Sequence, residues 1–234
     1  MKLAILDDDR VHGGELVRLF TDAGHLASHD DNAAAFIRRL QRDTVDMLVL
    51  DWNLPQSSGL EVLGWARANQ PPGLPVLMLT GRGEDSDILE GFAAGADDYV
   101  TKPAQPAILR ARVESLLRRA YPPPPATGKE TFGRYDLDAQ SQSAWVNGEA
   151  VGLTAKEFQL ALTMFRNQAR ALSRGYLLEA VWGKNPDLET RTLDAHASRI
   201  RQKLSLRPEN GFRLSTVYSY GYRLEPIEAA EEGE

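Results

Sequence analysis

One stretch of the chain, residues 45–55, most constrains how it can fold. Met47 to Leu50 is a continuous apolar run, which suits a strand covered on both faces of a parallel sheet. The run ends on Asp51, and a loop that contains Pro55 follows. Ligands of open α/β sheets lie at the carboxyl ends of the strands. The stretch therefore predicts a reactive carboxylate held by a rigid strand.

Four more short apolar segments lie within the first 120 residues, and segments with helical spacing separate them. We expect strands over Lys2–Leu6, Leu26–His29, Met47–Leu50, Pro75–Leu79 and Asp97–Thr101. We expect helices over Arg10–Asp22, Asn32–Gln41, Gly59–Ala68, Glu84–Ala93 and Pro106–Arg119. Five strand–helix repeats predict a doubly wound α/β domain with a five-stranded parallel sheet, spanning residues 1–120.

The chain changes character after this domain. Residues 121–129 contain four consecutive prolines, which favour an extended linker. Further short strands are expected over Phe132–Tyr135, Ser143–Val146, Ala150–Leu153, Phe212–Val217 and Tyr220–Leu224. Helices are expected from the Thr154–Glu157 capping box through Phe165, over Leu177–Trp182 and over Leu188–Leu206. This order predicts an α+β winged-helix domain over residues 130–224, followed by a disordered acidic tail, 225–234.

Composition excludes several classes of protein. The chain has no cysteine, so disulfides and thiolate metal sites are excluded. We find no signal peptide and no run near the roughly 18 apolar residues of a membrane span, so we expect a cytoplasmic protein without membrane contact. The net charge of −6 argues weakly against nucleic acid. Residues 122–224, however, carry 14 Lys or Arg against 10 Asp or Glu, so the second domain is basic.

Polar side chains follow the strands of the first domain, namely Asp7, Asp8, Asp51, Thr80 and Lys102. Because parallel strands end at one edge of a sheet, we expect these side chains to converge. Grouped carboxylates with no His or Cys nearby suit a hard cation, most plausibly Mg²⁺. Such a cation lets a carboxylate accept a phosphoryl group, with Lys102 neutralising charge and Thr80 donating a hydrogen bond.

Residues 1–120 resemble a receiver domain of bacterial two-component signalling, which has a flavodoxin-like fold. The matching motifs are Leu6-Asp7-Asp8-Asp9, Leu50-Asp51-Trp52-Asn53-Leu54-Pro55, Gly59, Leu79-Thr80-Gly81 and Gly95-Ala96-Asp97-Asp98-Tyr99-Val100-Thr101-Lys102-Pro103.

The resemblance implies that a sensor histidine kinase phosphorylates Asp51. It also implies that Asp8, Asp51 and the Asn53 carbonyl bind Mg²⁺, with Asp7 acting through water. Thr80 and Tyr99 would be the switch pair, and the Lys102–Pro103 peptide would be cis. We expect Trp52 to be a rim residue without chemistry.

The segment from Glu84 to Arg119 resembles the dimerisation face of the OmpR/PhoB subgroup. The resemblance assigns intermolecular salt bridges to Asp97, Asp98, Arg112 and Arg119. Ile88 and Ile108 stand where this subgroup usually pairs a basic with an acidic residue, and Ala104 replaces its usual aromatic residue. An apolar contact can replace such an ion pair, which contributes little at a rim.

The last expected helix carries one apolar stripe and many basic residues. Leu193, Ala197, Ile200 and Leu204 have the spacing of a buried stripe, which leaves Arg191, Asp194, Ser198, Arg201 and Lys203 free to face a major groove. The motifs from Leu153 to Phe158, Leu172 to Arg174, Leu178 to Gly183 and Arg191 to His196 resemble the winged-helix effector domain of OmpR/PhoB-type response regulators.

That resemblance implies binding to double-stranded DNA. It assigns DNA-facing positions to Arg191, Thr192, Asp194, His196, Ser198, Arg199 and Arg201. His196 could equally pack between helices, and Phe158, Leu162, Trp182 and Tyr222 are expected in the core. Tyr218 stands where the family commonly has Arg in the wing, so we expect weaker or altered wing contacts.

Three functions are compatible with these residues. The first is a phosphorylation-controlled transcription regulator that dimerises on phosphorylation, with RNA polymerase as a further partner. The second is a receiver whose output is protein binding. The third is a phosphohydrolase with an Asp nucleophile, but that chemistry normally uses a second acid where this chain has Asn53. We therefore expect no turnover of external substrates.

Overall fold

The computed structural model describes residues 1–81, 85–123, 128–183 and 190–227. The chain divides into two compact units, Met1–Pro123 and Pro124–Glu234. Within the described residues, no helix has the length and apolar character needed to cross a membrane.

The first unit alternates strands and helices, as the apolar pattern predicts. Its elements are β1 (Lys2–Leu6), α1 (Arg10–Asp22), β2 (Leu26–Asp30), α2 (Ala33–Arg42), β3 (Met47–Asp51), α3 (Gly59–Asn69), β4 (Val76–Thr80), α4 (Asp85–Ala93), β5 (Asp98–Thr101) and α5 (Pro106–Ala120). The predicted bounds agree to within one residue wherever both ends are described, and Glu84 lies outside the described residues.

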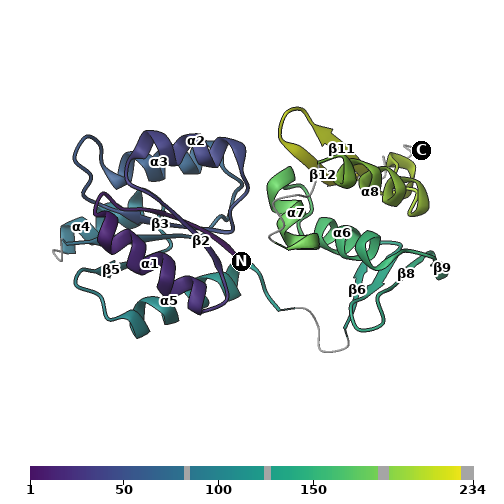
Figure 1. Cartoon of the computed structure of the whole chain (residues 1–234), viewed down its shortest axis with the longest axis horizontal. Helices are drawn as coiled ribbons and strands as arrows, with labels where there is room; N and C mark the ends of the chain where they lie inside the picture. The colour runs from purple at the N-terminus through teal and green to yellow at the C-terminus, as the bar shows by residue number, and fades with distance from the viewer. Residues whose placement is uncertain (82–84, 124–127, 184–189, 228–234) are drawn as a thin grey trace, which may run out of the picture. The chain divides into compact units, whose positions relative to one another are not determined.

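The five strands form one parallel sheet in the order β2-β1-β3-β4-β5. Helices α1 and α5 cover one face of the sheet, and α2 and α3 cover the other (Figure 1). Strand β3 is buried along its whole length, which explains its uninterrupted apolar sequence. The doubly wound α/β fold is confirmed.

The second unit is built from short strands around three helices. Its elements are β6 (Lys129–Phe132), β7 (Tyr135–Asp138), β8 (Ser143–Val146), β9 (Glu149–Val151), α6 (Ala155–Arg166), β10 (Ala171–Ser173), α7 (Arg174–Trp182), α8 (Thr190–Lys203), a 3₁₀ turn (Pro208–Asn210), β11 (Phe212–Val217) and β12 (Gly221–Pro226). Strands β6 to β9 form an antiparallel sheet in sequence order, and β12 pairs with both β10 and β11. This arrangement confirms the winged-helix fold.

Local sequence signals explain several of these elements. Thr154 and Glu157 form the expected capping box at the start of α6. The predicted stripe of Leu193, Ala197, Ile200 and Leu204 is buried, and it attaches α8 to the core of the second unit.

Other expectations for the second unit are wrong. The strand predicted over Phe132–Tyr135 is a turn between β6 and β7, because Gly133 takes a positive φ of 58° and reverses the chain. Helix α7 begins at Arg174 rather than Leu177, because Ser173 caps it. Helix α8 ends at Lys203, before the predicted end, and Leu188 lies outside the described residues.

Strand β10 and the 3₁₀ turn were not predicted. Two of the expected domain bounds also shift. Lys129, assigned to the linker, begins β6. Glu225 and Pro226, assigned to a disordered tail, continue β12, because Arg213 and Ser215 both donate hydrogen bonds to the Glu225 carboxylate. Residues 228–234 lie outside the described residues.

Candidate functional site

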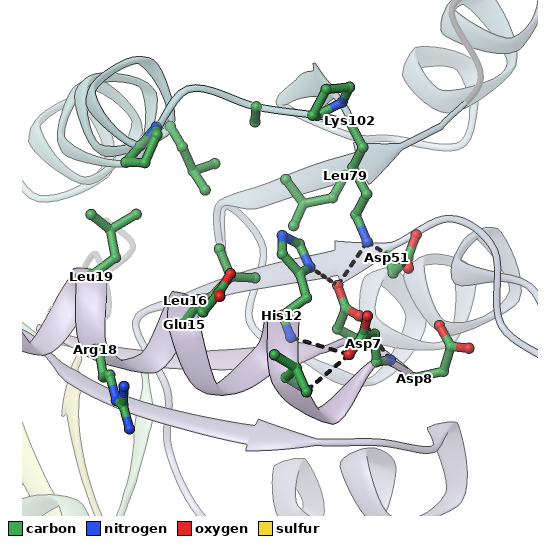
Figure 2. Close-up of a pocket in the computed structure, with 16 residues that line it drawn as sticks. Asp7, Asp8, His12, Glu15, Leu16, Arg18, Leu19, Asp51, Leu79 and Lys102 are labelled. Carbon is green, nitrogen blue, oxygen red and sulfur yellow. Dashed lines mark hydrogen bonds and ion pairs between the residues drawn. The ribbon is translucent and has the colours of Figure 1, made fainter.

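The carboxyl edge of the sheet gathers four of the predicted side chains. Asp7 follows β1, Asp51 ends β3, Thr80 ends β4 and Lys102 follows β5. Asp7, Asp51 and Thr80 are buried, with 0%, 5% and 2% of their surface exposed. The side chains of Asp7, Asp51 and Lys102 meet, as the parallel topology predicts (Figure 2).

Lys102 joins the two buried carboxylates. Its Nζ lies 2.8 Å from Asp7 Oδ2 and 2.8 Å from Asp51 Oδ2. Its amide donates to the Thr80 carbonyl, and the Lys102–Pro103 peptide is cis, as the resemblance implied. The ammonium therefore lies beside the Asp51 oxygens, where it can neutralise added negative charge.

Burial and the ion pair act in opposite directions on this site. Burial raises the pKa of the Asp51 carboxyl, while the Lys102 ammonium and the Asn53 amide partly oppose that rise. For Lys102, burial lowers the pKa, but the hydrogen bonds to Asp51 and Asp7 outweigh it and leave the pKa raised. We conclude that the lysine carries the proton, because its two carboxylate partners act together.

Three carboxylates could hold a cation. One oxygen from each of Asp7, Asp8 and Asp51 lies within 4.8 Å of the other two. Asp8 is exposed, and the Asn53 amide donates to Asp51 Oδ1 over 3.2 Å. An all-oxygen donor set suits a hard divalent cation such as Mg²⁺.

The expectation that no histidine lies near these acids is wrong. His12 Nδ1 lies 2.7 Å from Asp7 Oδ2, and His29 Nε2 lies 2.7 Å from the Asp7 carbonyl oxygen. Sequence reasoning missed both residues, because only the fold brings β2 and the first turn of α1 beside Asp7. The position of His12, one helical turn after the acids, was the feature of the sequence that could have indicated its contact with Asp7.

A cavity of about 920 Å³ opens beside the acids. Side chains from α1 and from the segment between β5 and α5 line it (Figure 2). Ala104 belongs to this lining.

The predicted switch residues lie beside Trp52. Thr80, Tyr99, Trp52 and Phe92 line one small cavity, and the Tyr99 ring meets Phe92 edge to face at 5.6 Å between centroids. Trp52 is only 5% exposed, and a Cβ at Gly91 would lie 3.0 Å from its ring. The expectation that Trp52 is a rim residue is therefore wrong, because its ring packs under α4.

Three of the four charged residues expected to bridge two subunits, namely Asp97, Asp98 and Arg112, have partners within the chain. Asp97 accepts a hydrogen bond from Arg67 over 2.7 Å, and Asp98 pairs with Arg112 over 2.8 Å. Arg119 is exposed, and the side chain of Ile88 lies outside the described part of the structure. Leu89, Phe92 and Ile108 are 69%, 45% and 46% exposed, so α4 and the start of α5 present apolar side chains to solvent.

In the second unit, one face of α8 is solvent-exposed. Its exposed residues are Arg191, Ala195, Ser198, Arg199, Gln202 and Lys203. Sequence analysis did not predict Ala195 and Gln202 on this face, because it favoured charged residues. Thr192 and His196 are half-buried, and the His196 ring meets Trp182 edge to face at 5.1 Å. This contact supports the packing alternative for His196.

Three residues of α8 that were expected to face a groove have partners within the second unit. The Asp194 carboxylate accepts hydrogen bonds from Arg174 over 2.7 Å and from the Tyr222 hydroxyl over 2.5 Å. Arg201 Nε donates to the Leu214 carbonyl over 3.1 Å. Lys203 Nζ donates to Glu157 Oε2 over 2.7 Å. Long side chains reach sideways to neighbouring elements, which helical spacing alone does not reveal.

The wing is the hairpin of β11 and β12. Tyr218 lies at its tip and is 93% exposed, whereas Tyr222 is buried. Burial, followed by the hydrogen bond to Asp194, raises the pKa of the Tyr222 hydroxyl to about 12, so this hydroxyl remains a donor at neutral pH.

Comparison with known proteins gives a family match for each of the two units. Residues 3–114 match the response regulator receiver domain, and residues 148–224 match the C-terminal domain of transcriptional regulatory proteins. The sensory transduction protein RegX3 of Mycolicibacterium smegmatis is 35% identical over 224 residues, which are 94% of this chain and 97% of that protein.

The phosphate regulon transcriptional regulatory protein PhoB of Rhizobium meliloti is 39% identical over 190 residues, 80% of this chain and 82% of that protein. The crystal structure of DrrB, a Thermotoga maritima OmpR/PhoB homolog, is 30% identical with a TM-score of 0.47, over 96% of this chain and 98% of that chain. The chain belongs to the OmpR/PhoB-type response regulators, the phosphorylation-controlled DNA-binding regulators of transcription in two-component systems.

Proposed function

We propose that Asp51 is the phosphoacceptor and that a sensor histidine kinase is the donor. The contact of Lys102 with both Asp51 and Asp7 is the observation that carries this proposal. In the transfer, an Asp51 oxygen attacks phosphorus as the bond between phosphorus and the kinase imidazole breaks. Lys102 neutralises charge on the transferred group, and the Thr80 hydroxyl donates a hydrogen bond to it.

We propose Mg²⁺ as the cofactor of this transfer. Asp8, Asp51 and the Asn53 carbonyl would hold the cation, with Asp7 acting through water. When bound, Mg²⁺ would supply the positive charge that lets two anionic groups approach. The clustered carboxylate oxygens of Asp7, Asp8 and Asp51 support this assignment.

The proposed output is dimerisation and promoter binding. Phosphorylation would shift an existing equilibrium through Thr80 and Tyr99 towards a conformation that pairs through α4, β5 and α5. Exposed Leu89, Phe92 and Ile108 support an apolar contact at this surface. Two linked DNA-binding domains would then engage two half-sites with increased effective affinity, and RNA polymerase would be a further partner.

The exposed face of α8 is the proposed reader of the major groove. Arg191, Ser198 and Arg199 are solvent-exposed, so they can reach base edges or phosphates. Tyr218 at the wing tip offers contact surface but no positive charge, which would weaken wing contacts with the minor groove.

Phosphorylation of Asp51 can be tested with acetyl phosphate and Mg²⁺. Intact-mass spectrometry should show one labile phosphoryl group on the native protein and none on Asp51→Asn. Asp8→Asn retains the phosphoacceptor Asp51, so it should still be phosphorylated, but half-maximal phosphorylation should require a higher Mg²⁺ concentration. A labile phosphate that persists in Asp51→Asn would contradict the assignment. Steady release of phosphate from added phosphate esters would favour the phosphohydrolase alternative instead.

A further inference from the structure

Asp7 is held from three directions. Its side chain is fully buried, and its Oδ2 lies 2.7 Å from His12 Nδ1 and 2.8 Å from Lys102 Nζ. Its Oδ1 accepts a hydrogen bond from the Asp9 amide over 3.0 Å. Figure 2 shows the His12 ring and the Lys102 ammonium converging on one oxygen of Asp7. The orientation of this carboxylate is therefore fixed by its partners.

The two side chains that contact Asp7 differ, because only Lys102 also contacts Asp51. Lys102 Nζ also contacts Asp51 Oδ2, so a phosphoryl group on Asp51 would draw the ammonium away from Asp7. His12 Nδ1 contacts the Asp7 carboxylate alone among the side chains of the described residues. A carboxylate oxygen accepts hydrogen bonds, so Nδ1 carries the hydrogen and donates. His12 can thus hold Asp7 while Lys102 is engaged elsewhere.

A second histidine holds the main chain of the same residue. His29 Nε2 donates to the Asp7 carbonyl over 2.7 Å, since a carbonyl can only accept. The ring fits there because residue 13 is glycine. A Cβ at Gly13 would lie 2.2 Å from His29 Nε2, whereas a Cβ at Gly14 would meet no atom within 4 Å.

We propose that His12 is a positioning residue for the carboxylate site: it fixes the Asp7 side chain in the orientation used in cation binding, while His29 fixes the Asp7 main chain. The inference rests on the proposed magnesium-dependent phosphorylation of Asp51. Hydrogen-bonding partners of metal-ligating groups typically change metal affinity about 10- to 100-fold when they are lost. Loss of His12 should therefore weaken Mg²⁺ binding, although His12 does not contact the transferred phosphoryl group.

The test is a Mg²⁺ titration of the full chain, followed by tryptophan fluorescence, because Trp52 is buried next to Asp51. His12→Leu should raise the Kd for Mg²⁺ by about 10-fold. His12→Asn should restore the Kd to within about 3-fold, because an Asn amide can donate from near the position of Nδ1. His25→Asn, which removes an imidazole paired with Glu114, should leave the Kd unchanged.

The half-saturating Mg²⁺ concentration for phosphorylation by acetyl phosphate should shift in the same way. A Kd for His12→Leu equal to the native value would overturn the inference. So would a Kd for His12→Asn as high as that of His12→Leu, when urea unfolding shows equal stability. If the native protein binds no Mg²⁺, the proposed function itself fails.

The two glycines of α1 give an independent comparison. Gly13→Ala should displace His29 and raise the Kd for Mg²⁺, because the Asp7 carbonyl loses its donor. Gly14→Ala should leave the Kd unchanged, because a Cβ there meets no other atom. Equal Kd values for the two variants would contradict the role of His29.

Discussion

Single residues in this chain owe their properties to burial combined with a specific partner. Asp51 is buried beside Lys102, so it is both desolvated and charge-compensated. Glu157 in the second unit is a comparable case without a proposed reaction. It is 1% exposed, and Oε2 accepts hydrogen bonds from the Thr154 amide over 2.8 Å and from Lys203 over 2.7 Å.

The Glu157 contacts predict how stability depends on pH. Burial alone would raise the pKa of Glu157, but the bonds from Lys203 and the Thr154 amide outweigh it and hold the pKa below 4.5. The unfolded chain therefore binds the proton more readily than the folded chain at this site. The stabilisation is present above pH 4.5 and is lost as the pH falls through the pKa of the folded state.

Glu157→Gln should lower the free energy of unfolding of the second unit by about 1–3 kcal/mol at pH 7, because Lys203 and the α6 cap each lose a charged partner. Calorimetry of the full chain should show a smaller loss of stability below pH 4.5 in this variant than in the native protein. Glu149→Gln, at an exposed position of β9, is the control and should behave as native. Native and Glu157→Gln proteins with parallel pH profiles would disprove this linkage.

The residues at the ends of the strands were predictable from the sequence, whereas the histidines that contact Asp7 were not. Asp51, Thr80 and Lys102 follow apolar runs, and parallel topology forces such positions to one edge. His12 and His29 reach Asp7 only through the packing of α1 against β1 and β2, which no spacing rule encodes. Trp52 was misjudged because a loop position after a strand says nothing about the direction of a ring.

At the scale of elements, α8 separates two kinds of basic residue. Arg191 and Arg199 lie on its exposed face, while Arg201 and Lys203 bind a β11 carbonyl and Glu157. Helical periodicity correctly gave the buried stripe, since burial repeats with the turn of the helix. Periodicity could not show which of the remaining basic residues contact other elements, because the long side chain of a lysine or arginine can reach a neighbouring turn or strand.

This division predicts different effects of two substitutions on DNA binding. Arg199→Ala should weaken binding to a site selected from a random DNA pool, by about 1–3 kcal/mol if it reads a base. If it contacts phosphate, the slope of log K against log salt should fall by about one. Lys203→Ala should leave that slope unchanged and lower the thermal midpoint, because Glu157 is left buried with one partner fewer. Equal loss of slope in both variants would show that Lys203 also contacts DNA.

Elements with strong periodic patterns were predicted best. The receiver strands and helices match their predicted bounds most clearly where an apolar run is buried as a unit, as in β1, β3 and β4. The first hairpin of the second unit was misassigned because Gly133 reverses the chain inside an apolar segment. Strand β10 has only three residues, too short for a pattern, and pairing with β12 alone defines it.

At the scale of the whole molecule, the proposed phosphorylation of Asp51 would have to affect a separate DNA-binding unit. The small cavity that Trp52, Thr80, Phe92 and Tyr99 line brings Thr80, at the end of β4, near Phe92 of α4. The ring of Phe92 contacts Tyr99, and Phe92 is also 45% exposed. The proposed dimer surface therefore shares a residue with the proposed switch.

Asp97 and Asp98 on this surface pair with arginines of the same chain, so we expect its pairing to depend on apolar contact. Burying an exposed leucine contributes about 1.5–3 kcal/mol, and a twofold-symmetric dimer counts each residue twice. Leu89→Glu should therefore raise the dimer dissociation constant of the phosphorylated protein by at least about 100-fold. Light scattering after treatment with acetyl phosphate should show a dimer for the native protein and a monomer for Leu89→Glu.

The extent of phosphorylation should be equal in both proteins, because Leu89 lies on α4 and does not line the cavity beside the acids. Gln41→Glu, at an exposed position of α2, adds the same single negative charge away from α4 and should dimerise as native. Dimerisation of phosphorylated Leu89→Glu at the native concentration would mean that another surface pairs the subunits. In that case the exposed apolar side chains of α4 and α5 would need a different partner, because exposed apolar groups clustered on one surface commonly mark a contact site.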